Sequence, residues 1–108
     1  YSRFAGKAVN WDGLEDAKGN LWQKQLHIFE VPFYYIEYGF AQLGAIAMWM
    51  NFSKNESATI NAYLNALALG YTKPIGEVYK TAGIEFDFSE KYVSKLADFL
   101  KNKIEEFH

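Results

Sequence analysis

Four side chains that can donate or exchange protons lie close together in the sequence: His27, Tyr34, Tyr35 and Tyr38. Residues three or four positions apart share a face of a helix, so the spacing predicts that Tyr38 contacts both other tyrosines. His27 precedes them and could fold back over the same helix end, where unpaired backbone N–H groups carry partial positive charge. Donors gathered there could bind an anion or stabilise a developing oxyanion.

The same residues also have a purely structural interpretation. Phenol and imidazole groups are costly to bury unless each finds a hydrogen-bond partner, and backbone carbonyl groups can fill that role. Under this interpretation the tyrosines form a hydrogen-bonded polar seam and His27 is a core histidine. The residue types and their spacing leave both interpretations open.

The element that must position the tyrosines is a long apolar segment. Proline suits the first turn of a helix, so the sequence predicts a helix from about Pro32 to Asn51. Because this segment is apolar almost all round, we expect it to be central and mostly buried. Gly39 and Gly44 lie inside it, and each costs about 1 kcal/mol relative to alanine. Such glycines indicate close approach by another element or a ligand.

Caps and stops outline the remaining helices. Upstream, we expect a loop with a helical turn near residues 14–18 and a short helix over residues 21–30. Together these segments predict an all-α helical bundle in a single domain, residues 1–108, with the Pro32 helix at its centre. The later boundaries predicted are Asn55 or Ser57 to Gly70, Thr72 or Lys73 as the cap before Pro74 with an end at Gly83, and a last helix starting after Asp87 or Ser89.

Composition excludes several function classes. The 108 residues carry a net charge of -2, without the basic stripe that a nucleic-acid partner requires. The sequence has no cysteine and two histidines, so we expect no zinc site within it, and it has no HExxH motif. A membrane span is disfavoured because Glu37, Gln42 and the tyrosines lie inside the long apolar segment. The absence of cysteine fits a cytoplasmic protein.

One continuous run is specific enough to indicate a family. The sequence LWQKQLHIFEVPFYYIEYGFAQLGAIAMW resembles the C-terminal region of oligoendopeptidase F and its relatives, zinc metallopeptidases related to thimet oligopeptidase. The resemblance is strongest over about residues 22–49 and continues more weakly to the end of the chain. It implies that the chain is the C-terminal part of a larger peptidase domain.

The resemblance also implies roles for the residues described first. In such enzymes an HExxH helix and a further glutamate bind zinc, upstream of the segment seen here. His27 and Tyr38 match the family's histidine and oxyanion-donating tyrosine, while Tyr35 and Tyr34 match substrate-binding positions. The implied partners are short peptide substrates and the upstream catalytic part of the same enzyme. This chain alone is expected to lack activity, and its uncovered apolar surface could cause self-association.

Two alternatives from other classes remain. The chain could be a non-catalytic helical module that binds peptides through the same tyrosines, or a purely structural helical domain. An HExxH motif upstream of Tyr1 would favour the peptidase, and a start codon just before Tyr1 would favour one of the alternatives.

Overall fold

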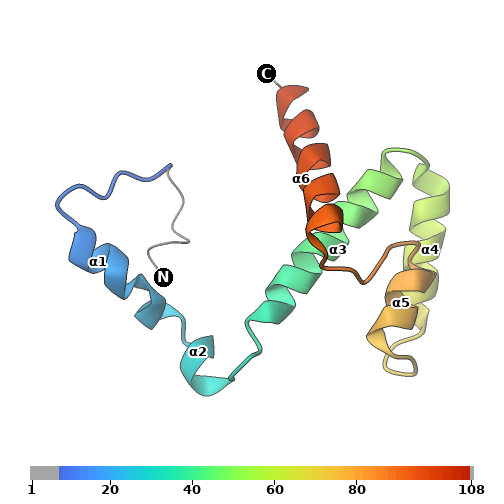
Figure 1. The fold of residues 1–108 in the computed structure, drawn as a ribbon. Helices are drawn as coiled ribbons and strands as arrows, with labels where there is room; N and C mark the ends of the chain where they lie inside the picture. The colour runs from blue at the N-terminus through green and yellow to red at the C-terminus, as the bar shows by residue number, and fades with distance from the viewer. Residues whose placement is uncertain (1–7, 108) are drawn as a thin grey trace. The chain divides into compact units, whose positions relative to one another are not determined.

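The computed structural model describes residues 8–107, and within them it contains helices and turns but no strand (Figure 1). The predicted all-α class is therefore confirmed. The elements in chain order are α1 (Glu15–Asn20), the 3-10 helix η2 (Leu21–Lys24), α2 (His27–Glu30), α3 (Ile36–Phe52), α4 (Glu56–Ala68), α5 (Ile75–Thr81) and α6 (Glu90–Glu105).

The chain divides into two compact units, Tyr1–Glu37 and Tyr38–His108. The described part of the first unit holds α1, η2, α2 and the turn that leads into α3. The second unit holds most of α3 together with α4, α5 and α6. The assignment of all 108 residues to one domain stays a prediction.

In the first unit, the single helix predicted over residues 21–30 is interrupted. Gln25 leaves the helical region, with φ -84° and ψ 87°, and separates η2 from α2. The rings of Trp22 and Phe29 still approach each other, with centroids 5.8 Å apart, so the apolar side predicted from their spacing persists across the break.

The long helix begins at Ile36, and its predicted start at Pro32 is wrong. Phe33 adopts a left-handed conformation with φ 66°, which an α-helix excludes. The Tyr34 N–H donates to the carbonyl oxygen of Val31 at 3.1 Å, which closes a turn around Pro32. Proline fixes its own φ and lacks an N–H, so it suits a turn as well as a first helical position.

The expectation that this helix is mostly buried is also wrong for the described chain. Within α3, Gly44 and Ala47 are the buried residues. Ala47 packs against Tyr92 and Leu96 of α6. The neighbouring helices of the second unit therefore cover a limited part of a helix that is apolar on nearly every side.

The boundaries of the later helices follow their local chemistry. The Asn55 side chain accepts from the Ala58 N–H at 3.0 Å and caps α4, and Ser89 caps α6 in the same way. Gly70 and Gly83 have positive φ, as predicted for helix stops. At α5 the cap position is Pro74, with ψ 149°, instead of the predicted Thr72 or Lys73. Among the helices of residues 8–107, none has the length and apolar character needed to cross a membrane.

Candidate functional site

In the first unit, three of the four candidate site residues form an aromatic cluster. The ring planes of His27 and Tyr34 are nearly parallel, at 7°, with centroids 6.3 Å apart. The rings of Tyr35 and His27 form a T-shaped pair, with centroids 5.7 Å apart and planes at 69°. His27 opens α2, and the turn around Pro32 returns the chain so that both tyrosines reach the histidine. We call these three residues the His27 cluster.

The His27 cluster is accessible in this chain. Tyr34 and Tyr35 are 46% and 48% exposed, and His27 is half-buried. The two phenols of the predicted polar seam are therefore not buried in the described chain. Aromatic rings with this exposure can present hydroxyl and ring nitrogen groups to a ligand.

Tyr38 belongs to the second unit and lies in the first turn of α3, where its side chain is 48% exposed. The expectation that Tyr38 shares one concave surface with the His27 cluster stays a prediction. What the structure gives directly is a phenol on a regular helix, in the same unit as the groove described next.

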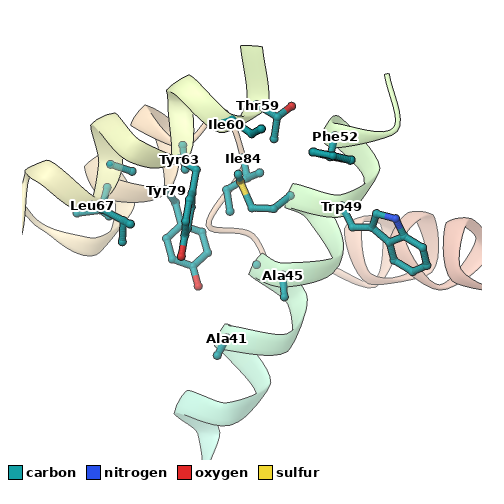
Figure 2. A pocket seen from close by; sticks show the side chains of 15 residues that line it. Ala41, Ala45, Trp49, Phe52, Thr59, Ile60, Tyr63, Leu67, Tyr79 and Ile84 are labelled. Carbon is teal, nitrogen blue, oxygen red and sulfur yellow. The ribbon is translucent and has the colours of Figure 1, made fainter. Parts of the chain in front are cut away.

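The second unit contains an apolar groove of about 630 Å³ between α3, α4 and α5 (Figure 2). Ala41 and Ala45 of α3 lie across the groove from the rings of Tyr63 and Tyr79. Its volume falls within the usual range of ligand pockets, roughly 300–1,000 Å³. The full lining is Ala41, Gly44, Ala45, Met48, Trp49, Phe52, Thr59, Ile60, Tyr63, Ala66, Leu67, Val78, Tyr79, Ala82 and Ile84.

Close contact between Gly44 and Tyr79 joins α5 to α3 at this groove. The Tyr79 hydroxyl donates to the backbone carbonyl of Phe40 at 3.1 Å. A Cβ on Gly44 would lie 3.0 Å from that hydroxyl oxygen. The expectation of close approach is thus confirmed at Gly44. At Gly39 an added Cβ would meet nothing within 4 Å, so no neighbour among residues 8–107 explains that glycine.

Partial burial changes the acidity of two phenols in the second unit. Desolvation raises the pKa of Tyr79 above its ordinary value, and nearby Tyr92 adds to the effect. Desolvation also raises the pKa of Tyr92, with further contributions from the charges of Glu85 and Asp87. Both phenols therefore stay protonated at neutral pH, and Tyr79 keeps the proton that it donates to Phe40.

An aromatic cluster anchors the segment between α5 and α6 to α3. The ring of Phe40 stacks on Phe88 with centroids 4.4 Å apart, and Phe86 packs edge-on against Phe40, Phe88 and Tyr79. Asn51 holds the same segment by donating to the carbonyl of Gly83 at 2.8 Å. These contacts fix α5, and with it Tyr79, against the N-terminal half of α3.

Tyr79 could not be recognised as a site residue from the sequence, because α5 and α3 are far apart along the chain. Gly44 is the sequence feature that pointed to this contact, because a glycine inside a helix indicates close approach, but it did not identify Tyr79 as the partner. Among residues 8–107, no three histidine, cysteine or acidic side chains are placed to hold a metal ion. The described residues can therefore bind, orient and donate hydrogen bonds, and they do not form a metal centre.

A protein-family model described as Peptidase family M3 matches residues 3–98 of the chain. This match covers both the His27 cluster and the groove. No curated protein and no solved structure was found to match the chain.

The contact between Gly44 and Tyr79 predicts that replacing glycine by alanine changes the free energy of unfolding differently at Gly39 and at Gly44, two positions of the same helix. Gly39→Ala should raise the free energy of unfolding by about 0.5–1 kcal/mol, because alanine is the better helix former and has space. Gly44→Ala should give no gain or a loss, since its Cβ presses on a hydroxyl held by Phe40. Urea unfolding followed by circular dichroism measures both. Gly44→Ala should gain stability when combined with Tyr79→Phe; equal gains at both glycines in the parent chain would contradict the packing account.

The raised pKa of Tyr79 predicts weaker folding in alkali. The unfolded chain releases this proton near pH 10, below the folded pKa, so stability is full below about pH 10 and falls as the pH rises further. Tyr79→Phe should make that fall shallower as the pH rises from about 10 to about 11. Tyr71→Phe is the matched control, because Tyr71 is fully exposed. Unfolding midpoints in urea across this range test the prediction, which fails if both variants have the same slope.

Proposed function

Because the chain belongs to peptidase family M3, we propose that it forms the substrate-binding part of a zinc-dependent oligoendopeptidase that hydrolyses short peptides. Within the family, the proposal specifies an enzyme similar to oligoendopeptidase F, as the run around the His27 cluster indicates. The observation that carries it is the family match over residues 3–98, which includes every candidate site residue. We further propose that the enzyme works in the cytoplasm.

The chemistry proposed for Tyr38 is hydrogen-bond donation. Peptide hydrolysis passes through a tetrahedral intermediate whose former carbonyl oxygen carries negative charge. A neutral phenol can donate to that oxygen, and a donor fixed on a helix needs little reorganisation when the charge develops. The exposure of Tyr38 in the first turn of α3 supports this role, because the hydroxyl must reach a substrate.

The His27 cluster is proposed to position the peptide. The packing of Tyr34 and Tyr35 around the imidazole fixes three rings relative to one another. Rings held in this way lose little conformational freedom when a substrate binds, which favours a productive orientation. Under this proposal Tyr35 chiefly binds substrate, His27 orients it, and Tyr34 supports the ring of His27.

Zinc enters the proposal through the family, whose members are generally zinc-dependent. The residues described here do not fit a zinc site, since no three suitable ligands come together among them. The zinc ligands are therefore proposed to come from the upstream catalytic part of the same enzyme. The roles proposed for His27 and Tyr38 involve hydrogen bonds to the peptide and no coordination of metal.

Exposed apolar side chains support packing of this chain against other protein surface. On α4, Ile60, Tyr63 and Leu64 are 43%, 48% and 56% exposed. Large exposed apolar areas of this kind mark interaction surfaces. We propose that the upstream catalytic part covers some of them, and that the isolated chain self-associates.

A non-catalytic peptide-binding module is the second candidate function, and the apolar groove is the observation that favours it.

Replacing Tyr38 tests the catalytic role in an intact enzyme that carries this segment. Tyr38→Phe should lower kcat by about 10²–10³-fold with little change in KM, because the lost bond forms only as the carbonyl becomes tetrahedral. Tyr35→Phe should instead raise KM, and His27→Ala should impair both constants. Tyr71→Phe, on a fully exposed residue, is the control and should leave both unchanged. Zinc content is measured in parallel and should not change. A kcat for Tyr38→Phe within about twofold of the parent enzyme would return Tyr38 to a packing role.

A further prediction of the proposed function concerns the isolated 108-residue chain. It should neither hold zinc tightly nor cleave short peptides, because a catalytic zinc site of the usual kind requires three protein ligands. Peptide cleavage is measured with added zinc, with and without a chelator. Stoichiometric, chelator-sensitive cleavage by the purified chain would contradict the proposal.

A further inference from the structure

The turn between α2 and α3 is of a type that normally uses glycine or asparagine. Its ends are Val31 and Tyr34, whose backbone groups are joined by the hydrogen bond of 3.1 Å described above. Pro32 and Phe33 are its two central residues. Proline fixes its own φ at a negative value, whereas Phe33 has φ 66°. A negative φ followed by a positive φ defines a type II turn, and glycine or asparagine is the usual residue at the second of these positions.

Phenylalanine is poorly suited to this position. In the left-handed region the Cβ of an L-residue crowds the following carbonyl oxygen, and glycine avoids the crowding because it has no Cβ. The Phe33 ring gains little packing in return, since its side chain is 94% exposed. Such a conformation persists where the surrounding structure holds it, and residues of this kind are concentrated at functional sites.

The surrounding structure at Phe33 is the His27 cluster. The Val31 N–H donates to the His27 carbonyl at 3.2 Å and closes the end of α2. The left-handed residue then redirects the chain, so that the next two side chains return to the imidazole as one parallel and one T-shaped ring pair. A right-handed Phe33 would send the following chain in another direction and carry both tyrosines with it. The backbone at Phe33 and the ring packing of the cluster therefore depend on each other.

We propose that Phe33 is a positioning residue for the His27 cluster: its left-handed backbone, and not its ring, determines how Tyr34 and Tyr35 lie against the imidazole. The consequence for activity rests on the proposed function, in which this cluster orients the peptide. A substitution that releases Phe33 from the left-handed region loosens the three rings and weakens peptide binding, although Phe33 itself does not touch the peptide.

Three substitutions separate the backbone of Phe33 from its ring. Phe33→Gly and Phe33→Asn remove the ring and introduce residues that adopt the left-handed conformation readily. Phe33→Val also removes the ring, but its branched Cβ makes a positive φ highly unfavourable. If the backbone determines the cluster, the glycine and asparagine variants keep the arrangement of the parent chain and the valine variant loses it.

Proton NMR of the full 108-residue chain measures this arrangement without requiring activity. The sequence has two histidines, so a His27→Gln variant identifies the ring signals of His27. Rings packed on an imidazole shift its proton signals and give Overhauser contacts between the rings. The shifts and the contacts of His27 with Tyr34 and Tyr35 should persist in the glycine and asparagine variants and disappear in the valine variant. Spectra are recorded at a concentration where dilution causes no further change.

The Overhauser contact between the rings of Trp22 and Phe29 is the matched control within the same unit. These rings lie 5.8 Å apart and do not belong to the His27 cluster. Their contact should persist in all three variants. Its loss in the valine variant would contradict the proposal, because Phe33 would then maintain the unit as a whole instead of positioning the cluster.

Kinetics in an intact enzyme that carries this segment test the consequence for activity. Phe33→Val should raise KM for a short peptide, with a smaller fall in kcat, because the loosened cluster binds the peptide less well while Tyr38 stays on its helix. The rise should be larger than in Phe33→Gly and Phe33→Asn. Zinc content is measured in parallel and should be the same in every variant.

Three further results would overturn the inference. Equal loss of the His27 contacts in the glycine and valine variants would assign the role to the ring of Phe33. Contacts that persist in the valine variant would show that the left-handed backbone is not needed. Equal rises in KM in the glycine and valine variants, with the cluster intact in the glycine variant, would indicate direct contact of the ring with the peptide. Tyr38→Phe kinetics test the proposed function separately, so the NMR result stands or fails independently of it.

Discussion

The contact of the Tyr79 hydroxyl with Gly44 and the Phe40 carbonyl determines how the second unit is arranged. A phenol packed against α3 at this point requires the absence of a side chain at Gly44, at a cost of about 1 kcal/mol in helix propensity. In return it fixes α5 against α3 by a hydrogen bond in a partly desolvated position. The groove exists because α5, together with α4, is held beside α3 at this point.

Two sides of α3 are used by neighbouring elements of the second unit. One side packs on α6 through Ala47 and Leu96, with Trp49 and Phe99 meeting edge to face at 5.3 Å. A second side forms the wall of the groove with small residues such as Ala41 and Ala45, which leave space instead of filling it. A helix used on two sides has little room for the polar face of a surface helix. The described residues leave other apolar side chains of α3 exposed, among them Ile36.

Local signals predicted the fold well, and non-local ones predicted it poorly. Asn55, Gly70, Gly83 and Ser89 act as caps or stops through bonds and dihedral angles within a few residues, so sequence alone could place them. The helix start predicted at Pro32 was wrong because proline is compatible with both a helix start and a turn. The left-handed conformation of Phe33 produces the turn. Burial of α3 depends on distant partners. The spacing predicted contact of Tyr38 with Tyr34 and Tyr35, which stays a prediction, and it could not identify the partner of Gly44.

The central claim is that Tyr38 donates to the oxyanion, and the binding of a tetrahedral mimic tests it most directly. A short peptide in which a phosphinic group replaces the scissile amide resembles the intermediate in shape and charge. In an intact enzyme carrying this segment, Tyr38→Phe should weaken binding of this inhibitor by the same factor by which it lowers kcat/KM, because both measure affinity for the tetrahedral form. An inhibitor affinity that is unchanged by Tyr38→Phe would contradict the claim.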